Sequence, residues 1–444
     1  MAGKEKSAKG QLATKKRGVL MTFQLISAEE WTERCNADGE FSIAARHWNG
    51  GIKIIADATA MCIGVENGIA GIYQPEHAHG LLTFEAPAAT WEKQLAELPP
   101  RFFNDVMANM STQSGMRREG DRLAGAQYYP AAARALELLR PIDSGTRKQT
   151  DITKREGAID TPVGRYVHLE LDGFDHRVYF EEAGQGGIPL LLQHTAGCHG
   201  SQWRHLFEDN RITDHFHLIA YDLPYHGKSL PPVEKNWWQE NYQLRGEFLR
   251  SIPIKLSECL DLDRPVFMGC SVGGLLALDL ACRHPDKFDS VISVEGALNI
   301  EGNLEGMQEM WHPQVSSDYK ARAMEGLIAP GSPIEFKKET GFVYSSAWPA
   351  AFLGDLTYYI EDFDIRNLAS EIDTDLTSVH ILSGEYDWSG KSELGREAHE
   401  MIKGSTWSEM QGVGHFPMSE NPRVFIEHLL PILEMVRQRR SETP

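Results

Sequence analysis

From Pro162 to the C-terminus, short apolar segments with strand character alternate with segments of helical character. RYVHLEL and HRVYFEEA come first, followed by IPLLLQH, FHLIAYD, PVFMGC, SVISVEG, SVHILSG and STWSEMQ. Apolar strands separated by helices are typical of a mostly parallel sheet that helices cover on both faces. In such sheets, ligands and reacting groups gather at the carboxyl ends of the strands. We therefore expect residues 162–444 to form a doubly wound α/β domain.

The preceding part of the chain follows a different pattern. Between about residues 21 and 145, strand-like runs (GGIKIIADATAMCIGVENGIAGIYQ, GLLTFEAP) come first, and helical runs (TWEKQLAELPPRFFNDVMANMS, YYPAAARALELLRPID) follow. This order predicts a smaller α+β domain. Residues 146–161 are polar and are expected to be a linker. Residues 1–20 are basic and lack an apolar core, so we expect a flexible leader rather than a secretory signal.

Charge and cysteine content restrict the partners and the compartment. The net charge of −19 argues against nucleic acid or an anionic membrane surface as the main partner. No apolar run approaches the roughly 20 residues that cross a bilayer. The six cysteines lack CxxC spacing and are expected to be reduced thiols of a cytoplasmic protein. His194, Cys198, His199 and His205 match no metal-ligand spacing, so we expect neither a metal nor an organic cofactor.

The segment VFMGCSVGGLLALDLACRHP places a serine between glycines where a strand is expected to meet a helix. Gly269-Cys270-Ser271-Val272-Gly273 fits the G-x-S-x-G pattern of a nucleophile elbow. The glycines let the strand and the helix approach closely. The serine at the sharp turn is strained and lies near the positive end of the helix. Glycine-rich turns of this kind also bind phosphates, so the prediction depends on partner residues elsewhere in the chain.

A serine nucleophile needs a base that an acid orients. SVHILSGEYDWSG places Asp387 just after a predicted strand, and MQGVGHFPMSENP places His415 in a loop lined by glycines. The chain order Ser271, Asp387, His415 is the order expected with a nucleophile elbow. We expect His415 to accept the serine proton and Asp387 to orient the imidazole ring. Glu385 and Glu295 are rival acids, and we prefer Asp387.

Hydrogen-bond donors for an oxyanion are expected at two places. The first is the backbone N–H of Val272, directly after the serine. The second is the loop that follows IPLLLQ, where we prefer the Ala196 N–H and keep Thr195 as the alternative. Candidate substrate contacts are Thr195, Trp203 and Trp388, since they lie near these elements in the sequence. Trp203 could equally be a residue that packs a helix into the core.

At these residues the chain resembles the α/β-hydrolase superfamily, over about residues 162 to 440. GCSVGG, LLQHTAG, DLPYHGKS, GEYD and GHFPMSENP carry the resemblance. It implies the α/β-hydrolase fold, the roles assigned above, and a helical lid over about residues 298–365. That interval is rich in Met, Trp, Tyr and Phe, which suggests an apolar substrate. Many relatives have His-Gly where this chain has His194-Thr195, and the bulkier residue narrows the oxyanion loop.

The first part of the chain resembles a sterol-carrier-type (SCP2-like) domain. VENGIAGIYQPEHAHGLLTFEAPAATWEKQL and GDRLAGAQYYPAAARALELLR carry this resemblance, which implies an apolar tunnel. The alternative is a domain that only pairs two chains into a homodimer or shields the active site. Both interpretations stay open at this point.

The hydroxyl at the elbow separates this chain from relatives that use a carboxylate there, the haloalkane dehalogenases and epoxide hydrolases. Our leading hypothesis is a serine hydrolase that cleaves a carboxylic ester of an apolar or aromatic small molecule through an acyl-Ser271 intermediate. The first alternative is a carbon–carbon bond hydrolase of aromatic ring-cleavage products, which would use the same triad. The second is a non-catalytic lipid-binding protein.

Overall fold

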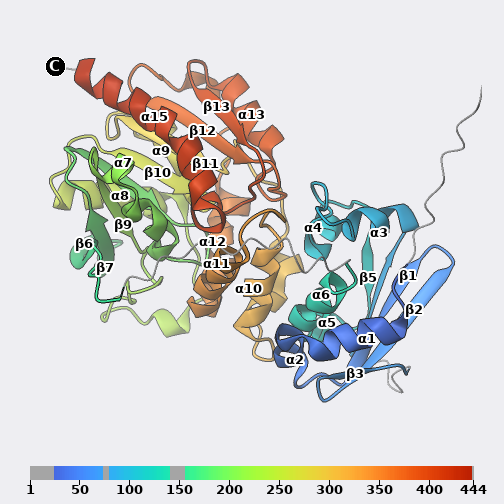
Figure 1. Ribbon diagram of the computed structural model, residues 1–444. Helices are drawn as coiled ribbons and strands as arrows, with labels where there is room; N and C mark the ends of the chain where they lie inside the picture. The colour runs from blue at the N-terminus through green and yellow to red at the C-terminus, as the bar shows by residue number, and fades with distance from the viewer. Residues whose placement is uncertain (1–24, 74–79, 141–155, 443–444) are drawn as a thin grey trace, which may run out of the picture.

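The computed structural model describes residues 25–73, 80–140 and 156–442. The predicted leader (1–20) and residues 146–155 of the predicted linker lie outside these ranges. Figure 1 shows a smaller body built from residues 25–140 beside a larger one built from residue 156 onward. The larger body contains an eight-stranded, mostly parallel sheet, and the smaller one a mixed sheet with helices. The predicted fold class is therefore confirmed.

The first domain contains a five-stranded sheet in the order β3-β2-β1-β4-β5. Its strands are β1 (Gly50–Ala56), β2 (Thr59–Glu66), β3 (Ile69–Gly71), β4 (Leu81–Ala86) and β5 (Arg117–Glu119). Its helices are α1 (Ala28–Ala37), α2 (Gly39–Ala45), α3 (Ala88–Gln94), α4 (Val106–Ser111), α5 (Arg122–Gln127) and α6 (Tyr129–Glu137). β1 pairs antiparallel with β2 and parallel with β4. The buried Trp31 indole ties α1 to α6 by donating to the Ala135 carbonyl at 2.8 Å.

The order of elements in this domain differs from the expected one, because α1 and α2 precede the strands. The Ser27 hydroxyl accepts the Glu30 N–H at 3.1 Å, and Asp38 accepts the Phe41 N–H at 2.8 Å. Such side chains satisfy N–H groups that the first turn of a helix leaves unpaired. The run TWEKQLAELPPRFFNDVMANMS forms two helices, α3 and α4, since Pro99 and Pro100 interrupt it.

The second domain has the strand order β13-β12-β11-β10-β8-β9-β7-β6. β6 (Val163–Leu171) and β7 (Phe174–Ala183) form an antiparallel pair that opens the domain. The strands that follow run parallel to one another: β8 (Ile188–Gln193), β9 (Phe216–Tyr221), β10 (Val266–Cys270), β11 (Ser290–Val294), β12 (Ser378–Gly384) and β13 (Thr406–Met410). Parallel pairing brings their carboxyl ends to one edge of the sheet.

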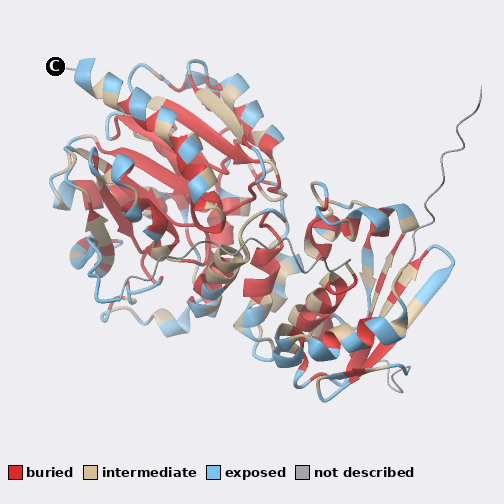
Figure 2. Cartoon of the chain, in the orientation of Figure 1, coloured by how far each residue is buried: buried red, intermediate tan, exposed pale blue. Residues whose placement is uncertain are grey.

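Helices cover both faces of this sheet, and its strands are its most buried part (Figure 2). Leu191 and Phe267 belong to a core cluster shared with α8 (Gly246–Cys259) and α9 (Val272–Arg283). Their neighbours along the strands, Leu190 and Met268, belong to a second cluster with α15 (Pro422–Glu442). α13 (Ser392–Met401) packs beside β12 and β13. Within the described ranges, no helix is both long and apolar enough to cross a membrane.

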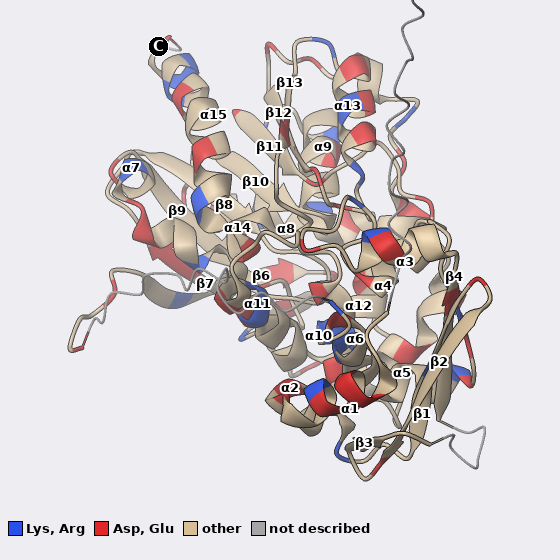
Figure 3. Ribbon diagram, turned by 45° about the vertical axis from the view of Figure 1, so that its right-hand side comes forward, with Lys and Arg blue, Asp and Glu red and all other residues tan. Residues whose placement is uncertain are grey.

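An insertion of helices separates β11 from β12. It contains η3 (Leu304–Trp311), α10 (Ser317–Glu325), α11 (Ile334–Ser346), α12 (Pro349–Leu356) and the π-helix η4 (Thr357–Asp362). α10 packs against α6 of the first domain, and charged residues of both signs lie near this contact (Figure 3). The first domain therefore rests on the insertion.

Candidate active site

Ser271 is the single residue between the end of β10 and the start of α9. Its φ of 58° and ψ of −113° are strained for any residue with a side chain. Glycine at position 269 permits the turn, because a side chain there would collide with the start of α9. A Cβ on Gly269 would lie only 2.4 Å from the carbonyl carbon of Gly273. The Ser271 N–H donates to the Val294 carbonyl at 2.9 Å, which fixes the turn to β11. The elbow thus holds the serine at the carboxyl edge of the sheet.

His415 and Asp387 come from the loops after β13 and β12 and are both buried. His415 Nδ1 lies 2.6 Å from Asp387 Oδ2, and the Ser389 N–H donates to Asp387 Oδ1 at 2.7 Å. Burial alone would raise the pKa of Asp387, but the attraction and hydrogen bond of His415 outweigh it and lower the pKa. Asp387 is therefore an ionised carboxylate placed to orient the His415 ring.

The two rival acids have other partners. Glu385 accepts the N–H of Gly412 at 2.8 Å. Glu295 is fully buried, accepts the N–H of Gly384 at 2.8 Å and lies against Asp387. Burial raises the pKa of Glu295 well above its ordinary value, and the neighbouring Asp387 carboxylate raises it further. Glu295 is thus a neutral acid whose O–H can donate a hydrogen bond to the Asp387 carboxylate.

A third carboxyl group, Glu420, is buried behind the His415 loop and accepts the N–H of Gly414. Burial raises its pKa from 4.5 to about 8. The folded chain binds this proton more tightly than the unfolded chain does. Protonation of Glu420 therefore increases the free energy of unfolding, and the whole of this contribution is present below about pH 4.5. This stability is lost as the pH rises toward 8, at roughly 1.4 kcal/mol per pH unit.

We therefore expect Glu420→Gln, which keeps an acceptor for the Gly414 N–H, to remove this pH dependence. Relative to the parent, the free energy of unfolding of the variant should rise by a few kcal/mol between about pH 5 and pH 8. Urea unfolding of both proteins at several pH values measures the difference. A difference that stays constant with pH would contradict the assignment of a protonated Glu420.

The loop after β8 is held in place by two of its own N–H groups. The Thr195 N–H donates to Gln202 Oε1 at 3.1 Å, and the Gly197 N–H donates to Asp355 Oδ2 of α12 at 2.7 Å. Asp355 also lies 2.9 Å from Nε2 of the buried His226, which ties the insertion to the core of the domain.

Ala196 lies between these two engaged amides and lines the same cavity as Ser271. On the other side of the serine, the Val272 N–H belongs to the first turn of α9, where N–H groups lack an acceptor within the helix. This geometry favours Ala196 over Thr195 as the second donor beside Val272.

Thr195 itself does not line that cavity and is only 1% exposed. Its hydroxyl donates to Gln202 Oε1 at 3.0 Å and lies 2.5 Å from the Tyr344 hydroxyl of α11. The position does not fit the predicted contact with substrate. Thr195 instead fixes the loop against the insertion, and we no longer assign it to the substrate pocket.

The two predicted tryptophans lie in different environments. Trp203 is fully buried and packs against Phe425 of α15, with ring centroids 6.3 Å apart. It is a core residue that does not line the cavity, so it too is no longer assigned to the substrate pocket. Trp388 does line the cavity, and its indole N–H donates to the Gly326 carbonyl at 3.2 Å.

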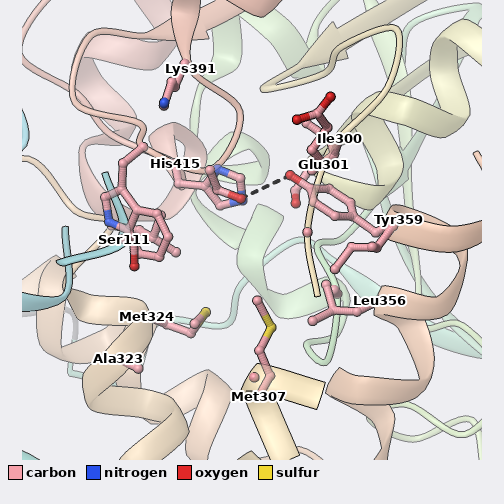
Figure 4. A pocket seen from close by; sticks show the side chains of 18 of the residues that line it. Ser111, Ile300, Glu301, Met307, Ala323, Met324, Leu356, Tyr359, Lys391 and His415 are labelled. Atoms are coloured by element: carbon pink, nitrogen blue, oxygen red, sulfur yellow. Dashed lines mark hydrogen bonds between the residues drawn. The ribbon is translucent and has the colours of Figure 1, made fainter. Parts of the chain in front are cut away.

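Ser271 and His415 open into a cavity of about 940 Å³ between the domain core, the insertion and the first domain. In Figure 4, Met307 and Met324 point into the space below His415, and Leu356 and Tyr359 lie across from Ser111. Met107 and Met310 line the cavity as well. Methionine side chains are apolar and flexible, so such a wall adapts to apolar groups of different shape.

Tyr359, in the π-helix η4, is a functional candidate that sequence reasoning grouped with the other aromatic residues of the lid without singling it out. Its hydroxyl lies 3.1 Å from the Ser389 hydroxyl and interacts with that of Ser271. Burial raises the pKa of Tyr359, so its hydroxyl stays protonated. It can therefore donate a hydrogen bond at the nucleophile.

The histidines singled out in the sequence have hydrogen-bond partners within the protein. His194 Nδ1 bonds the Thr195 carbonyl at 2.8 Å, and His205 Nε2 lies 3.0 Å from Glu339 Oε1. In the part of the chain that the structure describes, no group of three or more His, Cys, Asp or Glu side chains could hold a metal ion.

Known proteins with the same fold as the second domain were found by sequence and by structure. A family model described as alpha/beta hydrolase fold matches residues 188–323. The chain is similar to an esterase of Thermogutta terrifontis, with 19% identity and a TM-score of 0.53 over 61% of this chain and 99% of that chain. An esterase of Exiguobacterium antarcticum matches with 17% identity and a TM-score of 0.52 over 61% and 100% of the two chains. A bromoperoxidase of Bacillus anthracis matches with 19% identity and a TM-score of 0.51 over 61% and 100%.

A serine at a strained strand–helix turn, a histidine bonded to a buried aspartate, and a mostly parallel sheet occur together in this domain. The second domain has the α/β-hydrolase fold, and the matching family model covers residues 188–323 of it. The resemblance of the first domain to sterol carriers stays a prediction.

Proposed function

We propose that the chain is a serine hydrolase that cleaves a carboxylic ester of an apolar or aromatic small molecule through an acyl-Ser271 intermediate. The observation that carries the proposal is the strained Ser271 in one cavity with His415, whose ring is bonded to the Asp387 carboxylate. A serine needs such a base, and the base needs such an acid.

In the first half of the reaction, the Ser271 oxygen attacks the ester carbonyl carbon while His415 Nε2 takes the hydroxyl proton. The carbonyl oxygen becomes an oxyanion that accepts hydrogen bonds from the Ala196 and Val272 N–H groups. When the tetrahedral intermediate collapses, the bond to the alcohol oxygen breaks and His415 returns its proton to that oxygen. The alcohol leaves, and the acyl group stays on Ser271.

In the second half, a water molecule gives a proton to His415 Nε2 and attacks the acyl carbon. The bond to the Ser271 oxygen then breaks, and His415 returns the proton to the serine. The carboxylic acid leaves, and the site regains its starting state. Asp387 stays ionised throughout and stabilises the charged His415 ring.

Two of the similar solved structures are esterases by name, which supports ester hydrolysis as the reaction. The methionine, leucine and aromatic side chains among the residues that line the cavity support an apolar substrate. All six cysteines are free thiols, in accord with a reducing compartment, and we propose a cytoplasmic location. Pairing of two chains through the first domain stays a prediction.

The test is the hydrolysis of p-nitrophenyl esters from acetate to octanoate by the purified protein. We expect saturable turnover, with kcat on the order of 1–10³ s⁻¹ for the preferred ester. Turnover restricted to vinylogous diketones from aromatic ring cleavage, with no ester hydrolysed, would replace the proposal by carbon–carbon bond hydrolysis. Binding of lipid without turnover of either substrate would replace it by the carrier hypothesis.

A further inference from the structure

We propose that the first domain is a fixed wall of the catalytic cavity and that Ser111 limits the length of the acyl chain the enzyme accepts. The inference rests on the proposed esterase function and names its substrate class: esters of medium- and long-chain acids.

The first observation is that one cavity is lined from both domains. Met107 and Ser111 of α4 and Gln113 of the following loop line the cavity that also contains Ser271 and His415. By contrast, a cavity lined only by first-domain residues has a volume of about 10 Å³, which is too small for an acyl chain. Of these two cavities, the one beside the nucleophile is the one large enough for an acyl chain.

The second observation is that α4 is fixed to the insertion. Asp105 caps α4 by accepting the Met107 N–H at 2.7 Å. The same carboxylate lies 3.0 Å from Arg322 of α10, whose side chain is 5% exposed, and accepts the Tyr129 hydroxyl at 2.9 Å. Losing one partner of a buried ion pair leaves an uncompensated charge, which opposes separation of the domains.

Further polar contacts surround this buried pair. Asn104 donates to the Gly326 and Ile328 carbonyls at 3.2 and 3.1 Å. Arg101 makes two hydrogen bonds of 2.6 Å to Glu393 of α13. The wall is thus held both to the insertion and to α13 of the second domain.

The third observation is the shape of the loop after α4. Gln113 has a φ of 55°, a left-handed conformation that costs energy for a residue with a side chain. The turn is kept by the Ser114 N–H, which donates to the Asn109 carbonyl at 2.9 Å, and by the Met116 N–H, which donates to Asn109 Oδ1 at 3.0 Å. These bonds fix the backbone that carries Ser111 and Gln113 at the edge of the cavity.

The chemistry of the wall indicates the substrate class. The cavity lining is rich in methionine (Met107, Met307, Met310, Met324). Ser111 and Gln113 add polar groups from the first domain, and charged side chains line other parts of the cavity (Glu301, Arg366, Lys391, Glu397). A flexible acyl chain bound to Ser271 would pack on the methionines and end at the first domain. A short acyl group would not reach that far.

The test compares Ser111→Trp with Glu92→Trp, a matched control on the exposed surface of α3 in the same domain. Ser111 is exposed at the cavity mouth, so a larger side chain fits without disturbing the core. For Ser111→Trp we expect kcat/KM for p-nitrophenyl dodecanoate to fall about tenfold or more, while kcat/KM for the acetate stays within about twofold. Glu92→Trp should change neither value. Equal effects of Ser111→Trp on both esters, or no effect on either, would overturn the proposal.

Binding of sodium dodecanoate, measured by calorimetry, separates this proposal from the esterase function. We expect Ser111→Trp to weaken that binding about tenfold or more and Glu92→Trp to leave it unchanged. If the parent hydrolyses no ester but shows this binding pattern, the esterase function fails and the wall stands. If the parent hydrolyses esters and Ser111→Trp binds dodecanoate as the parent does, the wall fails and the esterase function stands.

Discussion

Replacing Ser271 with alanine is expected to lower kcat for the preferred p-nitrophenyl ester by about 10⁴-fold or more. The variant lacks the oxygen that forms the acyl intermediate, and the oxyanion donors alone supply only a small part of the rate. The change removes one buried oxygen at the turn, so the protein should fold as the parent does. Steady-state kinetics together with the thermal unfolding midpoint of both proteins measure the effect.

Two outcomes would contradict this expectation. A folded Ser271→Ala variant that retains more than about a hundredth of the parent kcat would mean that another group attacks the ester. If Ser271→Ala does not fold, the expectation of an undisturbed turn is wrong, and Ser271→Cys becomes the test of the nucleophile. That variant keeps a nucleophile of similar size and should retain the fold and form an acyl intermediate, and a folded Ser271→Cys that forms none would contradict the role.

Asp387→Asn is expected to lower kcat by about 10³- to 10⁴-fold, with a smaller change in KM. The amide is close in size to the carboxylate, but its NH₂ group can favour the wrong tautomer of His415, and it no longer stabilises the ring when that ring is charged. Glu385→Gln is the matched control, since Glu385 also follows β12 but bonds the Gly412 N–H rather than His415. We expect this control to stay within a few-fold of the parent.

The measurement is the pH profile of kcat for the two variants and the parent. A drop of similar size in both variants would mean that the loop, rather than the carboxylate of Asp387, supports catalysis. A large drop in Glu385→Gln alone would move the acid role to Glu385.

The elbow and its partners were predictable because local pattern determines them. Strand length and apolar content locate the ends of β10, β12 and β13, and parallel strands bring those ends to one edge. Ser271, Asp387 and His415 each follow such an end closely, so the sequence indicates where their backbones lie. The structure adds the contact between Asp387 and His415, in line with the preference for Asp387 over Glu385 and Glu295.

Side-chain direction was not predictable in the same way. Thr195 and Trp203 lie close to the site along the chain, but Thr195 turns toward Gln202 and Tyr344 and Trp203 packs under α15. Which side of a loop or helix faces the cavity depends on contacts far away in sequence. The wall formed by the first domain depends on such contacts too, since Asp105 and Arg322 meet across 217 positions of the chain (322 − 105).

The helix α1 could have been predicted from the sequence. Ser27 is followed three positions later by Glu30, which is a helix-start pattern, and the structure shows the Ser27 cap. Tyr359, in contrast, could not be singled out among the aromatic residues of the insertion. Its place at Ser271 depends on how η4 packs over the carboxyl edge of the sheet.

The central claim is that Ser271 is an activated nucleophile, and labelling by a fluorophosphonate probe tests it most directly. We expect one phosphonyl group per chain, located on Ser271 by peptide mass spectrometry, with no label on Ser271→Ala and much slower labelling of Asp387→Asn. Absence of label on the folded parent protein, or a label on a different residue that persists in Ser271→Ala, would contradict the account.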